Sequence, residues 1–123
     1  MSDLPQARPV QTPGPDGVLM AISNAPDEQT AQAIARALVE EGLAACVNIL
    51  PAGQSVYRWQ GAIEQAREHS LIIKTSKRRF NALAQRLTQL HPYELPELLA
   101  IAPDAVLPAY ADWVLRETRP RRA

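Results

Sequence analysis

Two side chains with metal-binding chemistry occupy distinctive positions, but their spacing assembles no metal centre. Cys46 lies inside the apolar run 44–50, where a cysteine is either a buried structural residue or a ligand or nucleophile. His91 opens a His-Pro-Tyr-Glu sequence at a predicted helix end, where an imidazole either offsets the negative helix terminus or acts as a ligand or acid–base group. A tight zinc site takes three or four protein ligands, and the sequence has no Cys-x-x-Cys or His-Glu-x-x-His pattern. The sequence thus provides candidate ligands without a complete site.

A second set of residues has the chemistry of a small-ligand site. Lys74 closes an apolar strand on the same face as Glu68, and it is either an ordinary strand-end lysine or the partner of an anion at a cleft rim. Glu94 either pairs with Lys74 or binds a cation. Tyr57 and Trp59 alternate along 55–59 and share one face, where they either pack or line a ligand. An acid–base cluster of Lys74, His91 and Glu94 would lack a nucleophile and a cofactor motif, so we predict that the chain is not an enzyme.

Four short apolar runs must position these side chains. They cover 18–22, 44–50, 71–73 and 98–101. Each is too short for a buried helix and too continuous for a strand with one wet face, which predicts strands covered on both sides. Helical spacing links the apolar residues of 31–38 and of 80–90, with Asp27 or a neighbour as the N-cap of the first helix and Gly42 as its stop. The stretch 55–59 is predicted to continue the second strand after a kink.

The order strand–helix–strand occurs twice, which predicts an α+β fold of the ferredoxin-like split βαβ type. We expect a four-stranded antiparallel sheet with helices on one face, plus a short C-terminal helix begun near Pro108. The second face of the sheet then needs another cover. Burying a Leu, Ile or Val side chain there would contribute about 1.5–3 kcal/mol, so a second copy of the chain is the expected cover.

Composition limits the function classes. The chain is predicted to comprise a disordered Pro-rich segment at 1–17, one domain at 18–118 and a frayed basic tail at 119–123. Thirteen basic residues balance thirteen acidic ones, which argues against a nucleic-acid-binding protein. No apolar run approaches the roughly 20 residues of a membrane span, and no secretory signal opens the chain. A single cysteine cannot form an internal disulfide, so we expect a cytoplasmic protein without membrane association.

Six motifs in order resemble the CutA divalent-cation tolerance family. They are Ala-Pro-Asp-Glu at 25–28, Leu-Ala-Ala-Cys-Val-Asn at 43–48, Ser-Val-Tyr-Arg-Trp-Gln-Gly at 55–61, Glu68 with Ile-Lys-Thr at 73–75, His-Pro-Tyr-Glu-Leu-Pro-Glu at 91–97 and Tyr-Ala-Asp-Trp at 110–113. The resemblance implies a ferredoxin-like subunit in a homotrimer similar to PII signal proteins. It also implies tolerance of copper and other divalent cations, with His91 and Cys46 as the metal ligands for Cu²⁺ or another divalent cation.

Two departures from the metal-linked members weaken that metal site. Ser23 stands where some of them carry a cysteine, and Leu90 stands where they carry a second histidine. Loss of a thiolate and an imidazole reduces the affinity expected for copper. The leading interpretation is therefore a trimeric CutA-like protein that binds metal weakly.

The alternative is a PII-like sensor that binds a small anionic ligand in clefts between subunits. Its predicted lining is Tyr57, Trp59, Glu68, Lys74, Tyr93 and Glu94. A lysine would meet the anion while aromatic side chains bury its apolar part.

Overall fold

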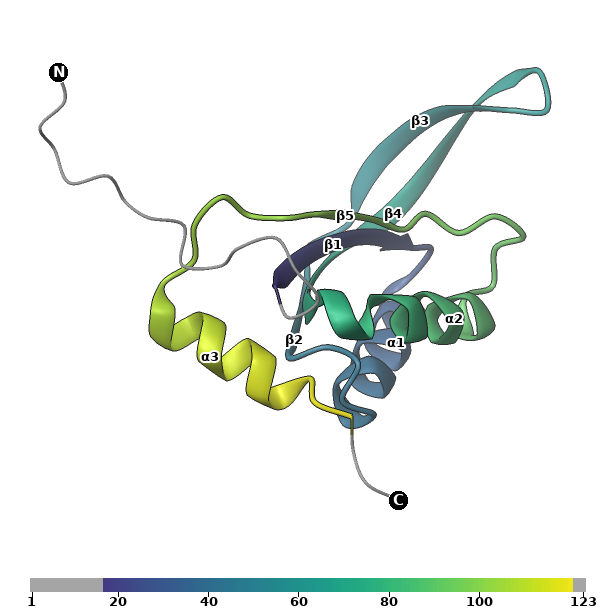
Figure 1. Ribbon diagram of the computed structural model, residues 1–123. Helices are drawn as coiled ribbons and strands as arrows, with labels where there is room; N and C mark the ends of the chain where they lie inside the picture. The colour runs from purple at the N-terminus through teal and green to yellow at the C-terminus, as the bar shows by residue number, and fades with distance from the viewer. Residues whose placement is uncertain (1–16, 121–123) are drawn as a thin grey trace, which may run out of the picture.

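The computed structural model describes residues 17–120 (Figure 1). The elements are β1 (Val18–Ala25), α1 (Glu28–Glu40), β2 (Cys46–Ile49), β3 (Gly53–Trp59), β4 (Ala62–Ser76), the 3₁₀ turn η1 (Lys77–Arg79), α2 (Phe80–Leu90), β5 (Leu99–Ile101) and α3 (Pro108–Glu117). The predicted disordered segment 1–17 lies outside the described residues except for Gly17, whose carbonyl accepts a hydrogen bond from the amide of Lys77. Of the predicted basic tail, residues 121–123 also lie outside them.

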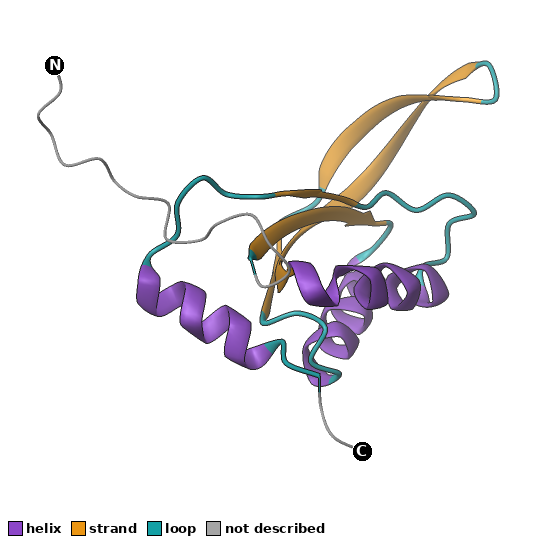
Figure 2. Cartoon of the chain, viewed as in Figure 1, coloured by secondary structure: helices purple, strands orange, loops and turns teal. Residues whose placement is uncertain are grey.

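The sheet has the order β2-β4-β1-β5, and every pair is antiparallel. Helices α1 and α2 lie on one side of it (Figure 2). This arrangement confirms the predicted α+β ferredoxin-like fold. None of the helices within 17–120 is long and apolar enough to span a bilayer.

The sheet contains five strands, one more than predicted. The additional strand arises because a kink at 50–52 divides the predicted second strand into β2 and β3. As predicted, the stretch 53–59 continues β2 after this kink, since both strands pair antiparallel with successive parts of β4 and the register shifts by one residue between Ile49↔Leu71 and Gly53↔Glu68. Strand β4 starts at Ala62 and runs for 15 residues, so the β3–β4 hairpin projects beyond the sheet (Figure 1). Gln60 and Gly61 form its tip with positive φ values of 50° and 83°, the backbone of a two-residue hairpin turn that glycine favours.

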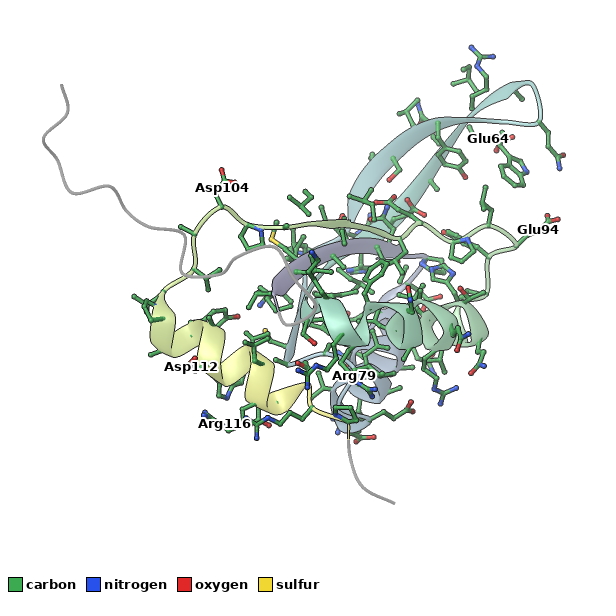
Figure 3. The ribbon with its side chains drawn as sticks, viewed as in Figure 1. Glu64, Arg79, Glu94, Asp104, Asp112 and Arg116 are labelled. Carbon is green, nitrogen blue, oxygen red and sulfur yellow. The ribbon has the colours of Figure 1, made fainter. Side chains whose placement is uncertain are left out.

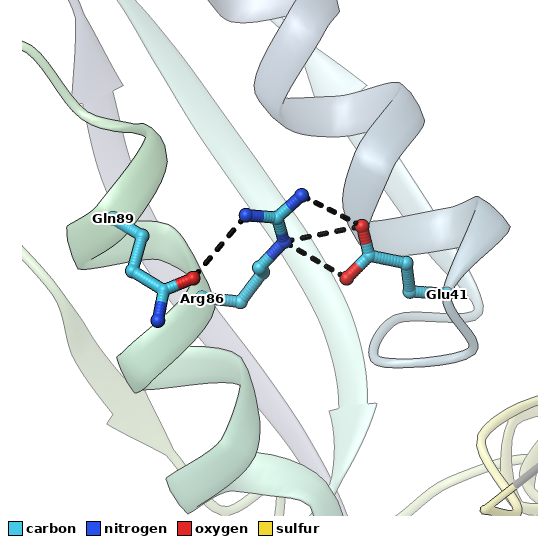
Figure 4. Close-up of polar contacts among 3 residues, drawn as sticks. All are labelled: Glu41, Arg86 and Gln89. Carbon is cyan, nitrogen blue, oxygen red and sulfur yellow. Dashed lines mark hydrogen bonds and ion pairs between the residues drawn. The ribbon is translucent and has the colours of Figure 1, made fainter.

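The ends of α1 follow the predicted signals. The Asp27 carboxylate accepts a hydrogen bond from the backbone amide of Thr30 at 2.7 Å, which lowers the pKa of Asp27. Gly42 takes a positive φ of 71° after the last turn. Arg86 of α2 then binds the Glu41 carboxylate through Nε and one terminal nitrogen, while its other terminal nitrogen donates to Gln89 (Figure 4). This contact ties the two helices together at the surface.

The main core lies between the sheet and its two helices. Its largest fully buried members are Ile34, Leu38, Leu71, Ile73, Leu83 and Leu87. A smaller cluster joins Ala111 and Val114 of α3 to Val18 and Ala45. At the end of α3, Thr118 donates a hydrogen bond to the hydroxyl of Ser76 at 3.1 Å. Helix α3 therefore packs where β1 begins and β4 ends.

One buried hydroxyl links the core to the turn after α1. Thr75 is fully buried, and its Oγ1 donates to the carbonyl oxygen of Leu43 at 2.7 Å. Thr75→Val keeps the shape but removes this donor, and we expect it to lower the free energy of unfolding by about 1–3 kcal/mol. Urea denaturation measures the change. Thr88→Val is the matched control, because the Thr88 hydroxyl donates to Ala84 on an exposed helix face. Equal losses in both variants would contradict the prediction.

The face opposite α1 and α2 carries a second apolar surface. Cross-strand partners share a face, which gives one row of Cys46, Lys74, Met20 and Ile101 and a second row of Asn48, Ile72, Ile22 and Leu99. Leu99 and Ile101 are 46% and 48% exposed. Helix α3 packs on the preceding row, at Val18 and Ser76, and its Tyr110 lies near Cys46 at the end of the first row. We call the two rows beyond Val18 and Ser76 the open sheet face.

Candidate functional site

His91 follows α2 and lies in a polar network at the end of β1. It is 7% exposed, and its Nε2 lies 2.6 Å from the carbonyl oxygen of Asn24. The backbone amide of Tyr93 donates to Nδ1 at 3.1 Å. Because an amide N–H can only donate, Nδ1 accepts and the proton is assigned to Nε2, which donates to Asn24. Both ring nitrogens are therefore occupied, and a metal ion could bind the ring only by replacing one of these contacts.

Tyr93 joins this network to β4. Its hydroxyl donates to Glu68 Oε2 at 2.7 Å, and Glu68 is 8% exposed. Burial raises the pKa of Tyr93 far above its usual value, the bond to the Glu68 carboxylate raises it further, and Tyr57 lies close enough to contribute. The structure thus brings together three of the predicted ligand residues, Tyr57, Glu68 and Tyr93.

The segment 91–98 is held on β1 by two further hydrogen bonds, and a third, from β4, fixes the Asn24 side chain. The buried hydroxyl of Ser23 donates to the carbonyl oxygen of Glu97 at 2.7 Å. The side-chain amide of Asn24 donates to the Glu97 carboxylate at 2.6 Å, and the Ser70 hydroxyl donates to Asn24 Oδ1 at 2.9 Å. Ser23, the predicted departure from a metal-linked cysteine, therefore has a structural role here.

Lys74 and Cys46 lie in a different part of the sheet, on the open sheet face. The Lys74 ammonium donates to Asn48 Oδ1 and lies 3.8 Å from Cys46 Sγ. Lys74 pairs with Met20, four residues before Asn24 on β1, which corresponds to about 13 Å along the strand. Cys46 and His91, the predicted metal ligands, are therefore not brought together within one chain.

The two remaining predicted ligand residues lie apart from these clusters. Trp59 is the last residue of β3, beside the hairpin turn. Glu94 is exposed in the loop after α2, where Figure 3 shows it away from the sheet. Among the described residues, no ion pair joins Glu94 to Lys74. Within 17–120, no three side chains of His, Cys, Asp or Glu are grouped so that they could hold a metal ion.

Comparison with known proteins places this geometry in a family. The family model of the CutA1 divalent ion tolerance protein matches residues 19–117, nearly all of the described chain. The chain belongs to the CutA family. A curated CutA divalent-cation tolerance protein of Thermus thermophilus is 45% identical over 93 residues, which cover 76% of this chain and 90% of the relative.

Solved structures of CutA proteins share the fold. CutA from the bacterium Xylella fastidiosa superposes with a TM-score of 0.81 at 46% identity, covering 83% of this chain and 98% of the other. CutA1 from Oryza sativa gives a TM-score of 0.82 at 30% identity, covering 88% and 100%. The mouse protein CutA is 40% identical over 104 residues, which cover 85% of this chain but 59% of the mouse protein. The CutA fold therefore spans nearly the whole described chain.

The sequence indicated several residues of this candidate site but not the residues that hold them in place. Asn24 and Glu97 were not predicted, because their contacts join positions more than 60 residues apart and leave no local signal. His91 is the C-cap residue of α2, and its backbone amide donates to the carbonyl oxygen of Leu87. The ring donates across to β1.

The Tyr93–Glu68 contact can be tested in this CutA protein by removing one hydroxyl. Tyr93→Phe leaves the buried Glu68 carboxylate without its donor, and we expect a loss of about 1.5–3 kcal/mol in unfolding free energy. The matched control is Tyr110→Phe, because Tyr110 is 37% exposed, close to the 36% of Tyr93, and its hydroxyl has no hydrogen bond within 17–120. Thermal and urea denaturation measure the loss of stability. If both variants were as stable as the parent protein, the prediction would be contradicted.

Proposed function

We propose that this chain is the subunit of a cytoplasmic homotrimer that serves in tolerance of divalent metal ions and binds a cation such as Cu²⁺ weakly. The observation that carries the proposal is the CutA family match over residues 19–117, together with relatives whose names specify divalent-cation tolerance. The chain acts without catalysis in this proposal.

The open sheet face supports the assembly. It presents Ile22, Ile72, Leu99 and Ile101 without cover from any helix of the described chain. A contiguous apolar surface of this kind is typical of an interface between proteins. Contacts between copies around a threefold axis would bury the open sheet face. The strands, which are apolar on both sides, would then be covered on both faces.

The arrangement of candidate ligands supports weak rather than tight metal binding. The two nitrogens of His91 already form hydrogen bonds, and the Ser23 hydroxyl is bonded to Glu97. Cys46 is partly exposed and supplies a soft sulfur ligand, with Lys74 nearby. Cys46 is therefore the better placed of the two predicted ligands.

Calorimetric titration with Cu²⁺ tests this proposal. We expect Cys46→Ser to weaken binding more than His91→Ala does, because Cys46 is partly exposed with only long contacts to its sulfur, whereas His91 is buried and both of its ring nitrogens are hydrogen-bonded. His69→Ala is the control, since the His69 ring contacts the Leu50 carbonyl oxygen and was not selected as a ligand. Unchanged Cu²⁺ binding in the Cys46 and His91 variants would exclude both as ligands.

The alternative is a PII-like sensor of a small anionic ligand. It is favoured by Lys74, whose partly exposed ammonium lies on the open sheet face where clefts between copies would form. The subunits on the two sides of such a cleft would then each contribute part of the proposed lining. A thermal-shift screen of anionic metabolites distinguishes the two functions, because a ligand at 100 times its Kd adds about 2.7 kcal/mol of stability.

A further inference from the structure

The basic residues of the chain are concentrated in two short stretches. Residues 77–79 and 116–122 hold seven of the 13 basic residues and one of the 13 acidic residues. The seven are Lys77, Arg78, Arg79, Arg116, Arg119, Arg121 and Arg122. The rest of the chain has six basic and twelve acidic residues, so the formal net charge of zero conceals a strong separation of charge.

The fold brings the first stretch and the described part of the second, 116–120, together. The Thr118 hydroxyl at the end of α3 donates to the Ser76 hydroxyl at 3.1 Å, and both residues are buried. Lys77 and Arg119 come directly after these two residues. Figure 3 shows Arg79 and Arg116 on the same lower side of the molecule, near the end of the described chain. We call Lys77, Arg79, Arg116 and Arg119 the basic surface.

Little negative charge offsets the basic surface. Arg116 forms an exposed ion pair with Glu117 at 3.8 Å, a contact that contributes little in water. Within residues 17–120, Lys77 and Arg119 have no ion pair. The first turns of η1 and α2 contain no acidic residue, so the positive end of the helix adds to the same potential. Arg79 donates through Nε to the carbonyl oxygen of Gly42 at 3.4 Å, a contact that leaves its charge and its two terminal nitrogens for an anion. The basic surface therefore has a positive potential.

We propose that the basic surface binds a linear polyphosphate chain. Three of its four side chains are arginines, whose planar forks match phosphate oxygens with two donors each. Base stacking on single-stranded nucleic acid needs aromatic platforms, and membrane insertion needs apolar anchors. The exposed large hydrophobic residues of the described chain all lie outside 74–92 and 111–120. The basic surface thus recognises closely spaced phosphates by charge alone.

Fluorescence anisotropy with end-labelled inorganic polyphosphate tests the proposal on the full chain. The logarithm of the binding constant should fall linearly with the logarithm of salt concentration, by about 0.7 for each phosphate contacted. A triple variant, Arg79→Gln, Arg116→Gln and Arg119→Gln, should bind at least about tenfold more weakly and with a shallower salt dependence. The matched control replaces Arg36, Arg58 and Arg67 with Gln, which removes the same charge elsewhere and should change binding little.

A second variant separates binding from folding. Arg116→Gln with Arg119→Gln changes only exposed side chains, and its unchanged melting temperature would exclude a folding defect. The proposal is overturned if polyphosphate does not bind, or if the triple variant and its control lose equal affinity. It is also overturned if single-stranded RNA of equal phosphate number, or vesicles containing phosphatidylserine, bind the basic surface as tightly as polyphosphate. Selective loss of polyphosphate binding in both basic-surface variants would support it.

Discussion

The substitution Ile72→Glu is expected to separate the proposed trimer into single chains of 13.5 kDa. Ile72 lies on β4 in the second row of the open sheet face, between Asn48 and Ile22. Assembly through this face would bury the new carboxylate without a partner, and burying an unpaired charge costs far more than the interface gains at one position. In one chain alone, the same carboxylate remains in contact with water.

Sedimentation velocity at micromolar concentration measures this outcome directly. The control is Val39→Glu, because Val39 is 38% exposed on α1, which lies on the other side of the sheet. We expect the control to keep the mass of the parent protein. The proposed assembly would be wrong if the parent protein itself sedimented as a compact single chain.

The elements that the sequence predicted correctly are those with local signals. Asp27 and Gly42 define the ends of α1 through contacts within a few residues, and Pro108 marks the start of α3. The first half of β4 was missed because 62–67 contains no apolar run. Its strand conformation depends on pairing with β3, where Glu64 lies opposite Tyr57 and Arg67 opposite Gln54. Pairing of this kind cannot be inferred from one segment alone.

The candidate site was predictable as a set of residue types but not as an arrangement. The resemblance selected Glu68 and Tyr93, and the structure joins them by a hydrogen bond across 25 positions. The suggested pairing of Lys74 with Glu94 did not form, because the Lys74 ammonium is bonded to Asn48 on the adjacent strand. The contacts between polar groups depend on strand register and on the path of the loop after α2. Neither of these can be derived from the spacing of residues in the sequence.

Ile73, the residue after Ile72, points to the opposite face of β4. Its substitution is the second prediction with a large expected effect, here on the free energy of unfolding. It is fully buried between Ala21 and Val47 in the core beneath α1 and α2. Ile73→Ala removes three carbons from the centre of the sheet and leaves a cavity, so we expect the free energy of unfolding to fall by about 2–5 kcal/mol. Urea denaturation at one fixed protein concentration is the measurement, since assembly would make stability depend on concentration.

Ile63→Ala on the same strand isolates the contribution of burial. Ile63 is 61% exposed on the projecting hairpin, so the same three carbons are lost there without a cavity in the core. The control should change stability by less than about 1 kcal/mol. Comparable losses at positions 63 and 73 would mean that the helix-covered face is not the main source of stability. Because Ile72 and Ile73 are adjacent on one strand, a loss of mass from the first substitution and a loss of stability from the second would assign assembly and folding to opposite faces of the same sheet.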